Sequence, residues 1–121
     1  MNLGFVDFDG GRLSYEVAGQ GPSVVLLHPG LWDSRTWDVQ FGAFSGRFRV
    51  LRYDVRGYGR SSRPERGRPY SHVADLVAVM DAAGMERAAL VGCSMGGAVA
   101  IDTAVTAPSR DGSHRCATSA P

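Results

Sequence analysis

Ser94 is the residue whose surroundings most clearly suggest chemistry. It is the centre of a Gly-x-Ser-x-Gly pattern in the stretch LVGCSMGGAVA, with Gly92 and Gly96 two residues away on either side. A serine hydroxyl is a weak nucleophile at neutral pH and needs a neighbouring base to remove its proton. It also needs hydrogen-bond donors that stabilise the negative charge on the attacked oxygen. The question is whether the chain supplies a base, an acid and such donors.

The segments around Ser94 have the strand–turn–helix order that this motif requires. Ala88–Gly92 reads as a short apolar strand, and Gly96–Ala107 reads as a helix of small residues. The sharp turn exposes the serine hydroxyl, and a side chain at Gly92 or Gly96 would clash across it. The pattern by itself arises by chance in glycine-rich chains. Its context favours a nucleophile over a glycine-rich start of a helix.

The preceding segments predict an α/β arrangement with parallel pairing. Asp9-Gly10-Gly11 is a hairpin signal between two short apolar strands. Ser71 is a candidate N-cap, and Gly84 a candidate end, for the helix before the serine strand. The expected strands are 5–8, 13–17, 24–27 and 48–53, and the expected helices are 37–44 and 71–84.

Three segments, in this order, resemble the α/β-hydrolase fold family, in its lactonase, esterase and perhydrolase-like branch. They are VVLLHPG at 24–30, RYDVRGYGRSS at 52–62 and LVGCSMGGAVA at 90–100. The resemblance covers residues 3–107 and is to the N-terminal half of that fold. It implies an incomplete α/β-hydrolase fold in residues 1–107, with a mostly parallel sheet after an N-terminal hairpin, flanked by helices.

The resemblance also implies roles for individual residues. Ser94 would attack the carbonyl of a small ester or lactone, without a cofactor or metal. The backbone N–H groups of Met95 and Gly30, with Leu31 as the alternative to Gly30, would form the oxyanion hole. Relatives commonly have glycine where this chain has Pro29, which has no N–H to donate. Serine at the turn argues against the dehalogenase- and epoxide-hydrolase-type relatives, which use an aspartate.

An acid and a base for Ser94 are not recognisable. In this fold they follow the serine in the order acid, then histidine. Asp102 lies within the following helix, whereas His72 precedes the serine. Residues 108–121, which contain Asp111 and His114, have no aliphatic or aromatic residue and are predicted to be disordered. We hypothesise a truncated or frameshifted hydrolase, with a non-catalytic fragment or interaction module as the alternative.

Several other residues favour structural roles. We expect His28 to support the loop before Gly30, and Asp54 with Arg56 to order the turn around Gly57 and Gly59. Gly57-x-Gly59 lacks the third glycine of a dinucleotide site. Trp32 and Trp37 could line a substrate entrance or cap the core, and both interpretations stay open.

The composition of the chain limits the classes of binding partner that we expect. The net charge of +1 and the acidic residues among the arginines give no reason to expect nucleic acid. No secretory signal, membrane span or metal-type cysteine spacing is visible, which predicts a cytoplasmic protein. The strand ending at Gly92 is expected to be an edge strand with open apolar faces, so we expect the chain to self-associate.

Overall fold

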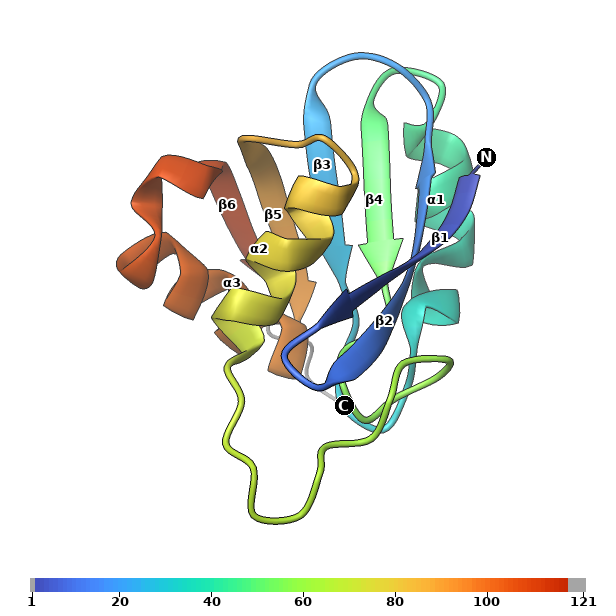
Figure 1. Ribbon diagram of the computed structural model, residues 1–121. Coiled ribbons are helices and arrows are strands. Elements are labelled where there is room, and N and C mark those ends of the chain that lie inside the picture. The colour runs from blue at the N-terminus through green and yellow to red at the C-terminus, as the bar shows by residue number, and fades with distance from the viewer. Residues whose placement is uncertain (1, 118–121) are drawn as a thin grey trace.

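The computed structural model describes residues 2–117, and the side chains of residues 2–112. The chain forms a six-stranded sheet in the order β1-β2-β4-β3-β5-β6, with helices on both faces (Figure 1). The strands are β1 (Asn2–Phe8), β2 (Gly11–Ala18), β3 (Ser23–Leu27), β4 (Arg49–Tyr53), β5 (Ala88–Cys93) and β6 (Asp111–Ala117). The helices are α1 (Asp38–Phe44), α2 (His72–Ala82) and α3 (Met95–Thr106), with short 3₁₀ helices at Ser34–Trp37 and Pro108–Arg110.

The N-terminal hairpin forms where the sequence predicts it. Strand β1 pairs antiparallel with β2, and Phe8 lies opposite Gly11. Asp9 and Gly10 between them have φ angles of 48° and 77°. Two consecutive positive φ angles fit the tight turn whose twist matches that of the paired strands. Strand β2 also pairs antiparallel with β4, and the remaining pairs (β3 with β4, β3 with β5, and β5 with β6) are parallel.

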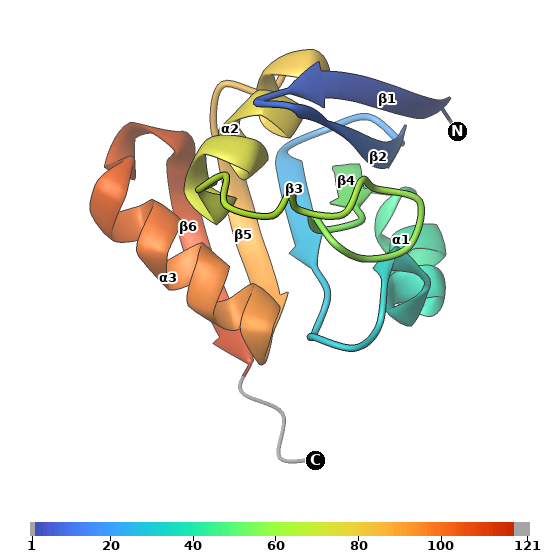
Figure 2. The same ribbon diagram turned by 60° about the horizontal axis from the view of Figure 1, so that its bottom comes forward.

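Strand β3 lies inside the sheet and contributes to both of its faces, because successive side chains point to opposite sides. Val25 and Leu27 belong to the core that includes side chains of α2 and α3. Val24 and Leu26 belong to a second core with Phe41 of α1. Figure 2 shows α1 well apart from α3, with the strands between them. The continuous apolar run VVLL is thus explained by burial on both faces.

Helix α2 begins and ends at the predicted residues. The Ser71 side chain accepts a hydrogen bond from the Ala74 N–H at 3.1 Å, which caps the first turn. Gly84, with a φ of 72°, follows the helix in the left-handed conformation that often ends helices. Four side chains of α2 (Asp75, Leu76, Val79 and Met80) are buried.

The structure differs from the sequence prediction after Ala107. Residues 108–110 form a 3₁₀ turn, and β6 pairs in parallel with β5 from Ala88↔Asp111 to Cys93↔Ala117. This pairing uses backbone N–H and C=O groups, so it needs no aliphatic side chains. Strand β5 is therefore not an edge strand, because it has β3 on one side and β6 on the other. The last part of the segment predicted to be disordered, 118–121, lies outside the described residues.

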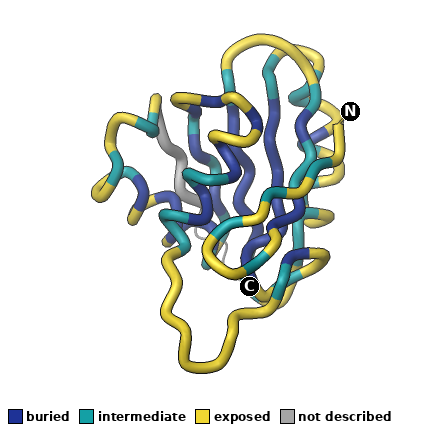
Figure 3. Tube along the Cα trace, in the orientation of Figure 1, coloured by how far each residue is buried: buried dark blue, intermediate teal, exposed yellow. Residues whose placement is uncertain are grey.

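The connection between β4 and α2 projects from the rest of the molecule. Figure 3 shows it as an exposed loop at the bottom of the view, and residues 63–71 are all exposed.

The helices found within residues 2–117 are too short or too polar to cross a membrane.

Candidate active site

Ser94 is the single residue between the end of β5 and the start of α3, and its backbone conformation is strained. Its φ and ψ angles are 55° and −114°, and its side chain is exposed. Positive φ is unfavourable for a residue with a side chain, and such strain persists only where the surrounding structure enforces it. This is the exposed serine turn that the sequence predicts.

Two glycines enforce the turn. A methyl group built on Gly92 would overlap the carbonyl oxygen of Gly96. A methyl group built on Gly96 would overlap the carbonyl oxygen of Leu27 at the end of β3. Glycine is needed at both positions because backbone approaches backbone there, which is the reason the sequence analysis gave for their spacing.

Met95 is the first residue of α3, and Ala98 N–H donates to the carbonyl oxygen of Ser94 at 3.0 Å. The N–H groups of a first helical turn have no partner within the helix, and this end carries partial positive charge. The Met95 N–H therefore lies at a position suited to an anion next to Ser94.

Gly30, the other predicted donor, lies close to Met95. A methyl group built on Gly30 would be 3.7 Å from both Cβ and Sδ of Met95, and 3.7 Å from the Tyr58 hydroxyl. The loop after β3 and the helix after Ser94 thus meet at Gly30 and Met95, and their role as an oxyanion hole stays a prediction. The alternative donor, Leu31, has a φ of 67° and is 92% exposed.

His28 is fully buried and supports this loop, as predicted. Val55 N–H donates to its Nε2 at 3.0 Å, so the other nitrogen, Nδ1, holds the proton and lies 2.7 Å from the Pro29 carbonyl oxygen. Burial lowers the pKa of the imidazole, which keeps it neutral. Since both ring nitrogens are engaged, His28 is not available as a base for Ser94.

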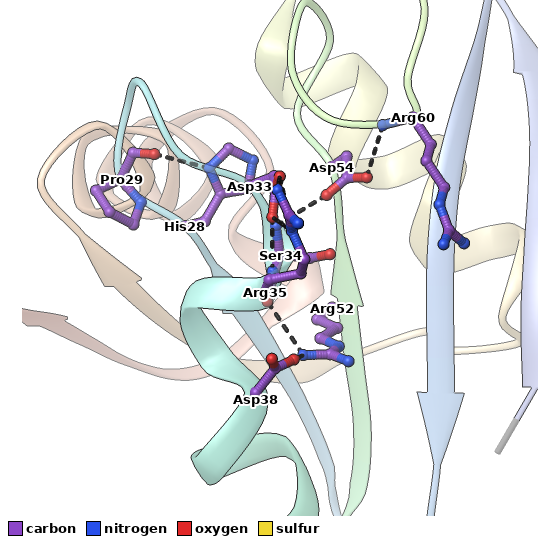
Figure 4. A network of polar contacts seen from close by, with 9 residues as sticks. All are labelled: His28, Pro29, Asp33, Ser34, Arg35, Asp38, Arg52, Asp54 and Arg60. Atoms are coloured by element: carbon purple, nitrogen blue, oxygen red, sulfur yellow. Dashed lines mark hydrogen bonds and ion pairs between the residues drawn. The ribbon is translucent and has the colours of Figure 1, made fainter.

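Asp54 fastens the other end of the same loop (Figure 4). Its Oδ1 accepts from Ser34 N–H at 2.8 Å, and its Oδ2 accepts from Arg60 N–H at 2.9 Å. One buried carboxylate therefore joins the loop after β3 to the loop after β4. The structural interpretation of Asp54 is confirmed.

Arg56 forms a buried ion pair with Asp75 of α2, through two hydrogen bonds of 2.8 Å. It also donates to the carbonyl oxygen of Phe8 at 2.9 Å, at the end of β1. The side chain thus ties the loop after β4 to α2 and to the hairpin, in the structural role that the sequence predicts. Gly57 and Gly59 both have positive φ angles, as a tight turn in this loop requires.

A hollow of about 680 Å³ opens beside the loop that contains Gly30. Trp32 lines it and is 67% exposed, whereas Trp37 packs against the second core. The two tryptophans therefore occupy different environments: Trp32 lines the hollow, and Trp37 packs against the core. Tyr58 also lines the hollow, and its ring packs edge-on against His28. Sequence reasoning missed Tyr58; the signal was an aromatic residue flanked by two glycines in the loop after a buried strand.

The remaining candidates for acid and base do not form a catalytic group with Ser94. Asp102 is exposed on α3, and His72 begins α2 with its ring against Tyr70. The side chain of His114 lies outside the described residues. Among the side chains that are described, no cluster of three or more His, Cys, Asp or Glu residues is arranged to hold a metal ion.

Comparison with known proteins identifies the family. The sequence profile of the α/β hydrolase fold matches residues 23–110. The chain belongs to the α/β-hydrolase fold family. It is 40% identical to a putative carbamate hydrolase, RutD, of Caulobacter segnis, over 93% of this chain and 43% of that protein. It is also 38% identical to the dihydrolipoyllysine-residue acetyltransferase component of an acetoin cleaving system from Cupriavidus necator, over 88% of this chain and 29% of that protein.

Solved structures of hydrolases also match this chain over most of its length. Est816, described as an N-acyl homoserine lactone degrading enzyme, superimposes with a TM-score of 0.86 at 36% identity, covering 92% of this chain and 43% of its own. An enol-lactonase from Burkholderia xenovorans gives a TM-score of 0.81 at 33% identity, covering 89% and 44%. The α/β-hydrolase chain therefore spans less than half the length of these relatives.

Proposed function

We propose that this chain supplies the nucleophile and the oxyanion-binding loop of a serine hydrolase acting on small esters or lactones. The observation that supports it most strongly is the strained, exposed conformation of Ser94 between β5 and α3. A buried structural serine would gain nothing from a positive φ, and strain of this kind concentrates at functional sites. The lactone and carbamate names of the relatives favour an acyl-transfer substrate.

In the proposed reaction the Ser94 hydroxyl attacks a carbonyl carbon, and the carbonyl oxygen becomes negatively charged. The N–H groups of Met95 and Gly30 donate to that oxygen. Preorganised donors of this kind are each worth about 3 kcal/mol of transition-state stabilisation. The partial positive charge at the start of α3 adds to this effect. The hydroxyl proton passes to water or to an added base as the Ser94 Oγ–carbon bond forms, and the leaving-group oxygen takes up a proton from solvent as the carbonyl re-forms. A water molecule then adds to the acyl carbonyl, which releases the carboxylic acid and returns a proton to the Ser94 oxygen.

The proposal assigns no base or acid among the described side chains. His28 and Asp54, the buried candidates nearest in the chain to Gly30, are both occupied by backbone groups. Without a base, the donors and substrate binding alone can still accelerate ester hydrolysis about 10³-fold over water. This background does not require Ser94; above it, the proposal predicts a weak activity that depends on Ser94 and rises when a base is added.

The test is hydrolysis of p-nitrophenyl butyrate by the full chain and by Ser94→Ala, with and without added imidazole as an external base. The matched control is Ser45→Ala, which changes an α1 C-cap serine whose hydroxyl bonds the Gly42 carbonyl oxygen at 2.8 Å. Imidazole alone also hydrolyses p-nitrophenyl esters, so the rate without protein is subtracted at each imidazole concentration. We expect the remaining, protein-dependent rate to rise with imidazole in the wild type and in Ser45→Ala, but not in Ser94→Ala. Equal rates in all three proteins would favour the non-catalytic interaction module instead.

A further inference from the structure

The hollow beside the loop after β3 contains an unusual exposed residue. Leu31 has a φ of 67°, yet its side chain is 92% exposed. A leucine in the left-handed region is strained relative to the right-handed one, and here burial of the side chain does not offset that strain. Glycine or asparagine would suit that backbone better. An exposed apolar side chain held in a strained conformation points to a binding role.

Leu31 does not stand alone. The next residue, Trp32, is 67% exposed, and both line the hollow together with Tyr58. Tyr58 contacts His28 edge-on, and its hydroxyl lies near Gly30. Leu31, Trp32 and Tyr58 are therefore the apolar part of a lining that is otherwise polar, and Leu31 directly follows the predicted oxyanion donor Gly30 in the chain.

The two charged side chains that line the same hollow have opposite charges and neutralise each other. Arg35 and Asp33 line it, and they satisfy each other through three side-chain hydrogen bonds of 2.8–3.2 Å. Thr36 adds an uncharged hydroxyl. A guanidinium already paired with a carboxylate is a poor receptor for an anionic ligand. The hollow instead suits an uncharged ligand with an apolar group.

We propose that this hollow binds the apolar substituent of an uncharged ester or lactone, with Leu31 and Trp32 as the side chains that determine specificity. The inference rests on the proposed function for the identity of the ligand. Its position follows from Gly30, which lies beside Met95 on one side of the loop and immediately precedes Leu31 in the chain. A substituent that extends from a carbonyl held at Gly30 and past Leu31 would enter the hollow.

Binding can be tested without turnover. A γ-lactam is the nitrogen analogue of a lactone and resists hydrolysis, so lactams with a hexyl, a methyl or a carboxyhexyl substituent serve as probes. Trp32 emission reports binding, and Trp32→Phe, which retains Trp37, shows which tryptophan responds. We expect the hexyl lactam to bind roughly tenfold more tightly than the methyl lactam, because more apolar surface is buried. We expect the carboxyhexyl lactam to bind less tightly than the hexyl lactam.

Leu31→Gly is the decisive variant. Glycine relieves the strain, so the urea midpoint should stay at or above that of the wild type while affinity for the hexyl lactam falls at least fivefold. Val39→Ala, at a 79% exposed position on α1 outside the hollow, is the control and should bind normally. Unchanged affinity in Leu31→Gly, or an equal loss in Val39→Ala, would overturn the inference.

The two proposals fail separately. Ser94→Ala should remove the part of the hydrolysis that imidazole stimulates through the protein, and it should leave lactam binding unchanged. Lactam binding without Ser94-dependent hydrolysis would refute the nucleophile and leave the binding site standing. Hydrolysis without a response of Trp32 to the hexyl lactam would refute the binding site alone.

Discussion

Ser94 and Leu31 are both non-glycine residues with positive φ angles, but the structure maintains them in different ways. Around Ser94, the main chain at Gly92 and Gly96 packs against other backbone so closely that no methyl group fits. Around Leu31, the side chain is almost fully exposed, and the loop is held at its base by His28 and Asp54. One strained residue is fixed by backbone packing, and the other by hydrogen bonds a few residues away. Changes near them should therefore differ greatly in effect.

The largest effect is expected at the packed turn. Gly96→Ala places a methyl group against the Leu27 carbonyl oxygen, and backbone on both sides leaves it no room. We expect a loss of about 4 kcal/mol or more in the free energy of unfolding, or failure to fold. Urea unfolding followed by circular dichroism measures this.

Gly42→Ala is the matched control. Gly42 lies in α1, and nothing lies within 4 Å of the added methyl group. The same chemical change should there stabilise the helix by about 0.5–1 kcal/mol. Similar stability of the two variants would show that the turn is not fixed by packing.

The next largest effect is expected at the buried ion pair that anchors the loop containing Tyr58. Asp75→Asn leaves Arg56 charged and buried, at a cost of about 3 kcal/mol. Asp7→Asn removes the partner of Arg12 in a pair whose side chains are 60% and 73% exposed, so its effect on stability should be far smaller and close to the error of the measurement. A comparable loss in both variants, measured by urea unfolding, would contradict the anchoring role of Arg56.

A pH-dependent effect is expected at the base of the Leu31 loop. Burial lowers the pKa of His28 below its ordinary value of 6.5, so the unfolded chain binds the proton more readily. Stability from this group is present above that pH and falls as the pH drops below it, by at most about 1.4 kcal/mol per pH unit. For each protein, the urea midpoint is measured below and above pH 6.5. We expect the midpoint to be lower at the lower pH in the wild type and in the control variant His72→Gln. This difference between the two pH values should shrink in His28→Gln; an unchanged difference there would exclude His28 as its source.

The smallest effect is expected at Leu31 itself. Leu31→Gly removes the strain but gives the unfolded chain more freedom, so we expect a gain of only about 0.5 kcal/mol. Urea unfolding measures it, and a clear loss of stability would show that the exposed side chain makes contacts the structure does not contain.

The same contrast explains what the sequence could predict. Gly92, Ser94 and Gly96 form a local pattern whose meaning depends only on a strand before it and a helix after it. Their arrangement was therefore predictable, as were the hairpin at Asp9 and the helix cap at Ser71. His28 and Asp54 were also predictable as supports, because each adjoins the end of a buried strand.

Features that depend on residues distant in the chain were not predictable. Tyr58 meets His28 and Gly30 only because β3 and β4 are paired, and the two glycines that flank it do not indicate which residues it contacts. Strand β6 has no apolar pattern, and its pairing with β5 uses backbone groups, which every sequence carries and which therefore give no local signal. The sequence did not indicate that Leu31 has a positive φ, because a leucine side chain disfavours that conformation.

The central claim, that Ser94 is a nucleophile, is tested most directly by its reaction with a fluorophosphonate, mapped by mass spectrometry of the peptides. Added imidazole should accelerate the reaction. The account predicts that phosphonylation occurs at Ser94 well before any other serine, and that Ser94→Ala shows only slow, scattered labelling. Labelling of Ser94 no faster than that of other exposed serines, such as Ser109, would contradict it.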